Sequence, residues 1–197
     1  MIGSLPACGK THVAIGFLRR ELARRRKAGY VCAVQTGPSD DARTVAERAP
    51  GTVCVTVHRY HAPLPPAAAA RLERADPARA AHVVEAVERL RPDTDGVVVE
   101  APGGLLDELN DRETVATMAV ALGLPLVVVT RPEAGALNAV ALTLSAARAH
   151  GLEVVGIAVN ACTGRPALVE RTIRAELGRL ADVIEAVPLE TAPAVRA

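Results

Sequence analysis

The segment from Gly3 to Thr11 has the residue types of a phosphate-binding loop at the start of a predicted helix. It ends in Gly9-Lys10-Thr11, the sequence with which a P-loop closes. In such a loop, backbone N–H groups surround phosphate, the lysine reaches the β- and γ-phosphates, and the threonine hydroxyl is a ligand of Mg²⁺. Lys10 is one of only two lysines among 23 basic residues, so its position is informative. We therefore predict that this segment binds a nucleotide.

Carboxylates that accompany such a loop are expected at the ends of buried strands. Glu100 ends the apolar run Val97-Val-Val, and a carboxylate there costs free energy unless it has a partner, which favours a functional role. Asp40 and Asp41 follow an earlier run. Two interpretations stay open for them, because either one could contribute to a metal site or simply cap the helix that follows.

The elements that must position these residues alternate along the chain. Runs rich in β-branched residues without internal alternation are typical of strands buried on both faces, and amphipathic helices between them supply the crossovers of a parallel sheet. The predicted strands are 30–35, 53–57, 96–100, 124–130, 154–160 and 183–187, and the predicted helices are 11–27, 42–49, 77–91, 112–122, 137–150 and 166–180. We predict a three-layer α/β fold like that of P-loop NTPases, with a mainly parallel sheet flanked by helices, in one domain over residues 1–197.

Two local features refine this prediction. Only Met1 and Ile2 precede the loop, so its first strand is expected to be missing, or the true start lies upstream. In the latter case, a longer chain with an apolar strand before the loop should be more stable and bind its nucleotide better. Asp76 and Pro77 are typical of a helix start, and residues 62–70 are expected to be a loop that turns into a short helix.

Composition excludes several classes of protein. The net charge is +1, which argues against a general nucleic-acid or membrane binder, and three aromatic residues are too few for a base-stacking platform. The four cysteines show no C-x-x-C spacing, and neither a signal peptide nor an apolar run of membrane length is found. We expect a cytoplasmic protein without nucleic-acid or membrane partners. His58 and His61 make a poor zinc signature, and Cys32 is interpreted as an inert strand cysteine.

Taken in order, several segments resemble the dethiobiotin synthetases, the ATP-dependent cyclo-ligases of biotin synthesis. Gly3 and Gly9 enclose five residues, as in that family's loop, where a common P-loop has four. The segments that carry the resemblance are 3–11, 34–42, 59–70, 99–105, 129–138, 156–160 and 187–188. The resemblance implies that a diamine, 7,8-diaminononanoate, is carboxylated with CO₂. ATP would phosphorylate the carbamate, and the second amine would close a cyclic urea.

The resemblance also implies roles for individual residues. Lys10 would hold the β- and γ-phosphates, and the Thr36 hydroxyl would lie near the carbamate. Gly103 and Gly104 would offer backbone N–H groups to the substrate, and the helix start at Gly135 to Asn138 would receive the substrate carboxylate across a homodimer interface. By the same resemblance, ATP would contact Gly9, Lys10, Thr11, His12, Asn160 and Pro188, and Mg²⁺ would be held by Thr11, Asp41 and Glu100.

This chain departs from the family pattern at residues that would take part in the reaction. The family has a second lysine where this chain has Cys32, and a thiol cannot neutralise an anionic carbamate. The loop contains Pro6 and Ala7, and Ala139 replaces a family histidine. Three hypotheses stay open: a working dethiobiotin synthetase, a relative that acts on another small amine or acid, and a non-catalytic nucleotide-binding partner protein.

Overall fold

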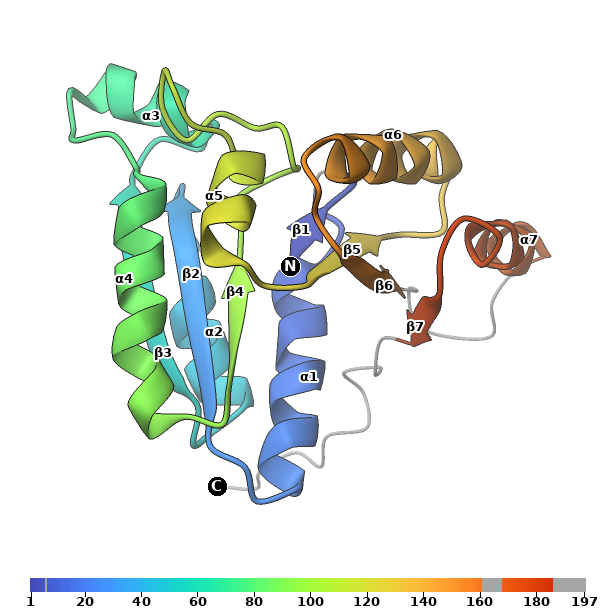
Figure 1. Cartoon of the computed structure of the whole chain (residues 1–197), viewed down its shortest axis with the longest axis horizontal. Coiled ribbons are helices and arrows are strands. Elements are labelled where there is room, and N and C mark those ends of the chain that lie inside the picture. The colour runs from blue at the N-terminus through green and yellow to red at the C-terminus, as the bar shows by residue number, and fades with distance from the viewer. Residues whose placement is uncertain (6, 161–167, 186–197) are drawn as a thin grey trace.

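The computed structural model describes residues 1–5, 7–160 and 168–185, and only the backbone of Glu185. Strands and helices alternate through most of this part of the chain (Figure 1). The strands are β1 (Ile2–Gly3), β2 (Ala28–Thr36), β3 (Val53–Tyr60), β4 (Gly96–Glu100), β5 (Leu126–Thr130), β6 (Val154–Val159) and β7 (Val183–Glu185). The helices are α1 (Lys10–Ala23), α2 (Asp41–Arg48), α3 (Pro66–Glu73), α4 (Ala80–Leu90), α5 (Val115–Leu122), α6 (Ala136–Ala149) and α7 (Leu168–Leu177), with one 3₁₀ turn, η1 (Arg91–Asp93).

Every ladder between the described strands is parallel, which confirms the predicted fold class. The strands form two sheets, with the orders β3-β2-β4 and β1-β5-β6-β7. Figure 1 shows β2, β3 and β4 on one side of α1, and β5, β6 and β7 on the other. Because parallel strands all end at the same edge, the turns after β1, β2, β4, β5 and β6 meet there, and this edge is where ligands bind in such folds.

Helices cover both faces of the strands, and residues next to each other in a strand pack into opposite layers. In β5, Val128 belongs to the core that α4, α5 and α6 cover, whereas Val129 packs with Val13 of α1. In β2, Val31 likewise belongs to the core on the side of α4, α5 and α6, whereas Cys32 faces α1 and α2. The predicted three layers are therefore present, because strands buried on both faces need a helical layer on each.

The first strand is short rather than missing, so that prediction was wrong in part. Ile2 and Gly3 pair with Val128 and Val129 of β5. Two residues are enough to form a strand here because the backbone of β5 holds them on one side. On the other side, Met1 bridges to β4: its amino group donates to the Val99 carbonyl at 2.7 Å, and its carbonyl accepts from Ala101 N at 3.0 Å. Met1 therefore lies between the two sheets.

An apolar cavity of about 280 Å³ lies beside this junction. It is lined by the facing edges of β4 and β5, by α5 and by Phe17 of α1, and Met1 and Ile2 form one end of it. Since close-packed interiors leave few voids larger than a water molecule, the space marks a place where the two sheets are incompletely packed.

Other local predictions had mixed outcomes. The helix predicted at 77–91 begins at Ala80, and its N-cap is Arg79, so the proposed start at Asp76 and Pro77 was wrong. The predicted short helix exists as α3, which has Pro66 at its first position. In the part of the chain that the structure describes, no helix has both the length and the apolar character that crossing a bilayer requires.

Candidate functional site

The predicted phosphate loop joins β1 to α1, and the helix begins at Lys10, one residue before its predicted start. Gly9 precedes α1 with a φ of 84°, a left-handed conformation that favours glycine, and Lys10 and Thr11 form the first turn of the helix. The positive end of the helix dipole therefore faces the loop, an arrangement that binds anions. Ala7 also has a positive φ of 47°, which costs free energy for a residue with a side chain and is typical of a functional loop.

Asn160 braces this loop from the end of β6. Its side-chain amide donates to the carbonyl of Cys8 at 3.0 Å. A Cβ atom on Gly9 would collide with the same amide, so the loop and Asn160 leave no room for a side chain between them. In this structure the amide nitrogen of Asn160 contacts the phosphate loop, and its predicted role towards adenine stays a prediction.

Glu100 is the buried carboxylate at the centre of the site. Thr11 Oγ1 donates to its Oε1 at 2.9 Å, and Tyr30 OH donates to its Oε2 at 2.8 Å. Burial raises the pKa of Glu100, and the hydrogen bond from Tyr30 and the charge of Lys10 oppose this shift. The structure thus brings Lys10, Thr11 and Glu100 together, with β4 supplying the acid and α1 supplying the cation and the hydroxyl.

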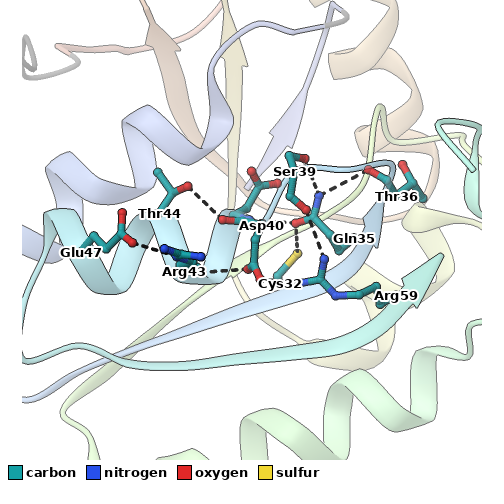
Figure 2. Close-up of polar contacts among 10 residues, drawn as sticks. Cys32, Gln35, Thr36, Ser39, Asp40, Arg43, Thr44, Glu47 and Arg59 are labelled. Carbon is teal, nitrogen blue, oxygen red and sulfur yellow. Dashed lines mark hydrogen bonds and ion pairs between the residues drawn. The ribbon is translucent and has the colours of Figure 1, made fainter. Parts of the chain in front are cut away.

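The turn after β2 is built around Gln35 and Asp40 (Figure 2). The side chain of Gln35 accepts from Asp41 N at 2.9 Å and donates to Ser39 Oγ at 2.8 Å. Asp40 caps α2 by accepting from Arg43 N at 3.0 Å, and it forms an ion pair with Arg59 at 2.9 Å. The capping interpretation therefore applies to Asp40.

Asp41 is the first residue of α2, and its position is compatible with a metal site. It is close enough to Glu100 for its charge to help raise the pKa of Glu100. Carboxylate and hydroxyl oxygens are the ligands that Mg²⁺ prefers, and this ion is commonly held by one or two carboxylates together with nucleotide phosphates. Among the residues that the structure describes, no three His, Cys, Asp or Glu side chains lie close enough together to hold a metal ion by themselves. The donor set of Thr11, Asp41 and Glu100 therefore fits Mg²⁺ only as a site that phosphate oxygens complete.

Cys32 occupies the position where the resemblance led us to expect a cation. It is buried on β2 and pairs with Glu100 in the β2–β4 register. Burial raises the pKa of its thiol strongly, and the charges of Glu100 and Asp41 raise it further, whereas Arg59 lowers it. The thiol is therefore protonated at neutral pH, which agrees with an inert cysteine rather than a nucleophile.

The residues predicted to contact the substrate lie at the same edge. Thr36 ends β2 and is half-buried, and Gly135 and Asn138 are exposed at the start of α6. Gly103 has a φ of 53°, and its carbonyl accepts from Gly3 N at 3.1 Å. Gly104 N donates to Asp107 Oδ2 at 2.9 Å, so a substrate oxygen there would compete with this carboxylate. The substrate roles of these residues stay predictions.

The remaining candidate residues are His12, Pro188 and His58. His12 lies in the first turn of α1, next to Thr11. Pro188 lies outside the described residues, as does Pro6 of the loop. His58 stacks on His82 of α4, with ring centroids 5.2 Å apart, and among the described residues it belongs to no group of three or more candidate metal ligands.

Sequence reasoning missed Tyr30, Gln35 and the structural role of Arg59. Tyr30 and Gln35 lie within a run that is typical of an ordinary buried strand. Only the hydrogen bond that Tyr30 donates to Glu100 and the one that Gln35 accepts from Asp41 N show that they serve the site. A polar Gln35 at the end of an apolar run was a signal that could have been used, because buried polar groups need partners.

Comparison with known proteins identifies the family. A protein-family model described as an AAA domain matches residues 2–192. The chain is 43% identical over 138 residues to the ATP-dependent dethiobiotin synthetase of Saccharopolyspora erythraea, covering 70% of this chain and 62% of that protein. It is 41% identical to the enzyme of the same name from Anaeromyxobacter dehalogenans, covering 80% of this chain and 74% of that protein. The match thus spans less than two thirds of the first relative.

Solved structures agree on the fold. The septum site-determining protein MinD of Pyrococcus horikoshii, solved with Mg-ADP, aligns with a TM-score of 0.59 and 20% identity, over 98% of this chain and 85% of that chain. This similarity shows the P-loop fold alone. The sequence matches are closer, and from them the chain belongs to the dethiobiotin synthetase family.

Proposed function

We propose that this chain is an ATP- and Mg²⁺-dependent cyclo-ligase of the dethiobiotin synthetase type, acting in the cytoplasm. The observation that carries the proposal is the cluster of Lys10, Thr11 and Glu100 at the helix start beside the phosphate loop. The substrate would be a diamine, 7,8-diaminononanoate, together with CO₂.

The reaction would proceed in three balanced steps. One amine adds to CO₂ and loses a proton, which gives a carbamate. A carbamate oxygen attacks the γ-phosphorus of ATP and displaces ADP, forming a mixed anhydride. The second amine attacks the carbamate carbon, expels phosphate and loses a proton, so that a cyclic urea closes. Phosphoryl transfer of this kind depends on positioning and on neutralising spread negative charge.

This chain's residues would supply both. Lys10 and the N-terminus of α1 would hold the β- and γ-phosphates, and the Thr36 hydroxyl would donate to the carbamate. Thr11, Glu100 and Asp41 would hold Mg²⁺, which when bound neutralises phosphate charge. The positive φ at Gly9 and the brace from Asn160 would keep the loop in shape before the nucleotide arrives.

The test is nucleotide binding, followed by turnover. We expect ATP to bind in calorimetry with Mg²⁺, and Lys10→Ala to weaken it about 100-fold, because a charge-assisted contact with phosphate is lost. Lys27→Ala is the matched control, since it removes the chain's other lysine, which is exposed after α1. Equal effects of the two substitutions, or no binding by the unaltered chain, would contradict the proposal.

One observation favours a second candidate function. Cys32 stands near the carboxylates of Glu100 and Asp41 where the family has a lysine, so the substrate side of the site lacks that lysine. A relative that acts on another small amine or acid, or a nucleotide-binding partner protein without catalysis, would fit this as well. Complementation of a biotin auxotroph that lacks the synthetase separates these cases. Growth supports the first proposal, and failure together with ATP hydrolysis that depends on another small molecule supports a relative that acts on another substrate.

We also propose a homodimer. Gly135 and Asn138 lie exposed at the start of α6, where they could reach the substrate site of a second copy. Sedimentation should then give twice the chain's mass. Asn138→Ala should raise KM for the diamine and leave ATP affinity unchanged.

A further inference from the structure

Tyr30 is a buried hydroxyl donor that the proposed reaction does not use. It is the third residue of β2, has no exposed surface, and its hydroxyl donates a hydrogen bond to Glu100 Oε2 at 2.8 Å. In the β2–β4 register, Tyr30 pairs with Val98 and Cys32 with Glu100. Because alternate residues of a strand face the same layer, Tyr30 lies one step behind Glu100 on the face towards α1.

The two oxygens of Glu100 are held from different elements. Thr11 of α1 donates to Oε1, and Tyr30 of β2 donates to Oε2. Thr11 lies in the first turn of α1, directly after the phosphate loop, so Oε1 is the oxygen held from the loop side of the site. Tyr30 belongs to the same buried apolar cluster as Ala14, Ile15 and Leu18 of α1, so the core holds its ring in place.

A buried carboxylate held through only one oxygen can rotate about its last bonds, and it also leaves the other oxygen unpartnered, which costs free energy. The hydrogen bond from Tyr30 removes both problems. It also leaves Oε1 directed at Thr11 whether or not a nucleotide is present, which is the arrangement that a preformed ion site needs.

We propose that Tyr30 is a positioning residue of the site: its hydroxyl holds Glu100 Oε2 so that Oε1 stays directed at Thr11 and the phosphate loop. This rests on the proposed use of a Mg²⁺-nucleotide. Tyr30 itself contacts no substrate. Its effect is expected only where Glu100 acts, in the contribution of Mg²⁺ to nucleotide affinity.

The experiment compares Tyr30→Phe with Tyr60→Phe. Phenylalanine keeps the ring and removes only the hydroxyl. Tyr60 is the chain's other tyrosine, and its hydroxyl donates to the Asp76 carbonyl at 2.7 Å, so its removal also deletes one hydrogen bond. ADP affinity is measured for each protein by calorimetry, once with Mg²⁺ and once with EDTA, and the ratio is the readout.

We expect Tyr30→Phe to reduce the gain in ADP affinity from Mg²⁺ by about tenfold, as loss of a hydrogen bond to a charged group implies. Its affinity in EDTA should match that of the unaltered chain. Tyr60→Phe should leave both values unchanged. In a Glu100→Gln background, Tyr30→Phe should have no further effect on the ratio, because the group it positions has been altered.

Two outcomes with Tyr30→Phe would overturn the proposal. An unchanged ratio in Tyr30→Phe would show that Glu100 needs no positioning, and equal losses with Mg²⁺ and with EDTA would show a merely structural role. Tyr30→Met, a second variant without the hydroxyl, applies the same test if Tyr30→Phe does not fold. Failure of the proposed function gives a different result: the unaltered chain binds no ADP, or binds it equally with Mg²⁺ and with EDTA. That result also overturns the proposal on Tyr30, which rests on the proposed function.

Discussion

The two sheets of this protein contribute to one site but differ in how they are built. The β3-β2-β4 sheet has strands of 8, 9 and 5 residues, whereas the β1-β5-β6-β7 sheet has strands of 2, 5, 6 and 3. The first carries Glu100 and the turn to Asp41. The second carries the phosphate loop and Asn160, and α1 crosses between them to pack on β2 and β4.

The junction between the sheets therefore determines whether the site is complete. It consists of the backbone bonds of Met1 to Val99 and Ala101, the bond of Gly3 to Gly103, and the hydrogen bond of Thr11 to Glu100. An apolar cavity lies directly beside it. The acidic half is thus built from longer strands but has Cys32 where the resemblance leads us to expect a lysine, while the phosphate half has Lys10 but is joined to the acidic half through few contacts.

The largest effect is expected from placing a lysine at Cys32 in the acidic half. Cys32→Lys would place an ammonium opposite Glu100 in the register and near Asp41, and these carboxylates offset the cost of burying it. We expect turnover with the diamine, CO₂ and ATP to rise about 100-fold, the usual effect of one preorganised charge.

Cys32→Met is the control for this change, because it adds length without charge. Turnover is followed as ADP release that depends on both diamine and CO₂. If Cys32→Lys folds and binds ADP but turns over no faster than Cys32→Met, the chain is not a synthetase that lacks only this lysine.

A smaller effect is expected from loosening the phosphate half at Gly9. Gly9→Ala introduces strain at a φ of 84° and a collision with the Asn160 amide, so the loop or Asn160 must move. We expect ADP affinity to fall at least tenfold and the free energy of unfolding to fall by about 1–3 kcal/mol.

Gly123→Ala separates these two causes. Gly123 also has a positive φ, of 59°, but a Cβ atom there meets nothing within 4 Å. It should therefore lose stability from backbone strain while keeping its ADP affinity. Equal affinities of both variants would show that Asn160 does not brace the loop.

The junction should also respond to pH. Burial lowers the pKa of the Met1 amino group from 8.0 to about 6, an effect that the charge of Glu100 partly opposes. Between these values the unfolded chain binds more protons than the folded one. The contribution to stability is therefore complete above pH 8 and is lost as pH falls towards 6, by up to about 3 kcal/mol.

Urea unfolding at pH 8, 7 and 6 measures this dependence in a chain whose first residue is Met1. Acetylation of the amino group removes its titration and should remove this part of the pH dependence. The same slope in both forms would mean that the amino group is not buried at the junction.

The smallest effect is expected from filling the cavity. Ala119 is a buried residue of α5 that lines it, and Ala119→Leu would place added methyl groups in the empty space. We expect the free energy of unfolding to rise by about 1 kcal/mol. Val120→Leu, at a neighbouring position that is 51% exposed, should change it by less than about 0.5 kcal/mol. A loss of stability in Ala119→Leu would show that the cavity cannot accept a side chain.

Much of the fold could be predicted from the chain alone, because periodicity reports burial. Strand β2 and helix α1 were found near their true bounds, since apolar runs and helical spacing are local signals. The start of α4 was not, because Asp76 and Pro77 form a plausible cap that tertiary packing does not use. The length of β1 was also misjudged, because two residues become a strand only when β5 and β4 are there to pair with them.

The candidate site, like the fold, was predictable from the sequence only in part. By itself, the sequence determined which residue types were available: the loop ending at Lys10 and Thr11, the acid at Glu100, and a thiol in place of a second lysine at Cys32. These follow from local motifs, which need no knowledge of distant contacts. Only the tertiary structure decided that Thr11 and Tyr30 hold the two oxygens of Glu100, since these residues lie 89 and 70 positions from it. A buried carboxylate must find its donors wherever the packed elements bring them, and that is decided by the fold.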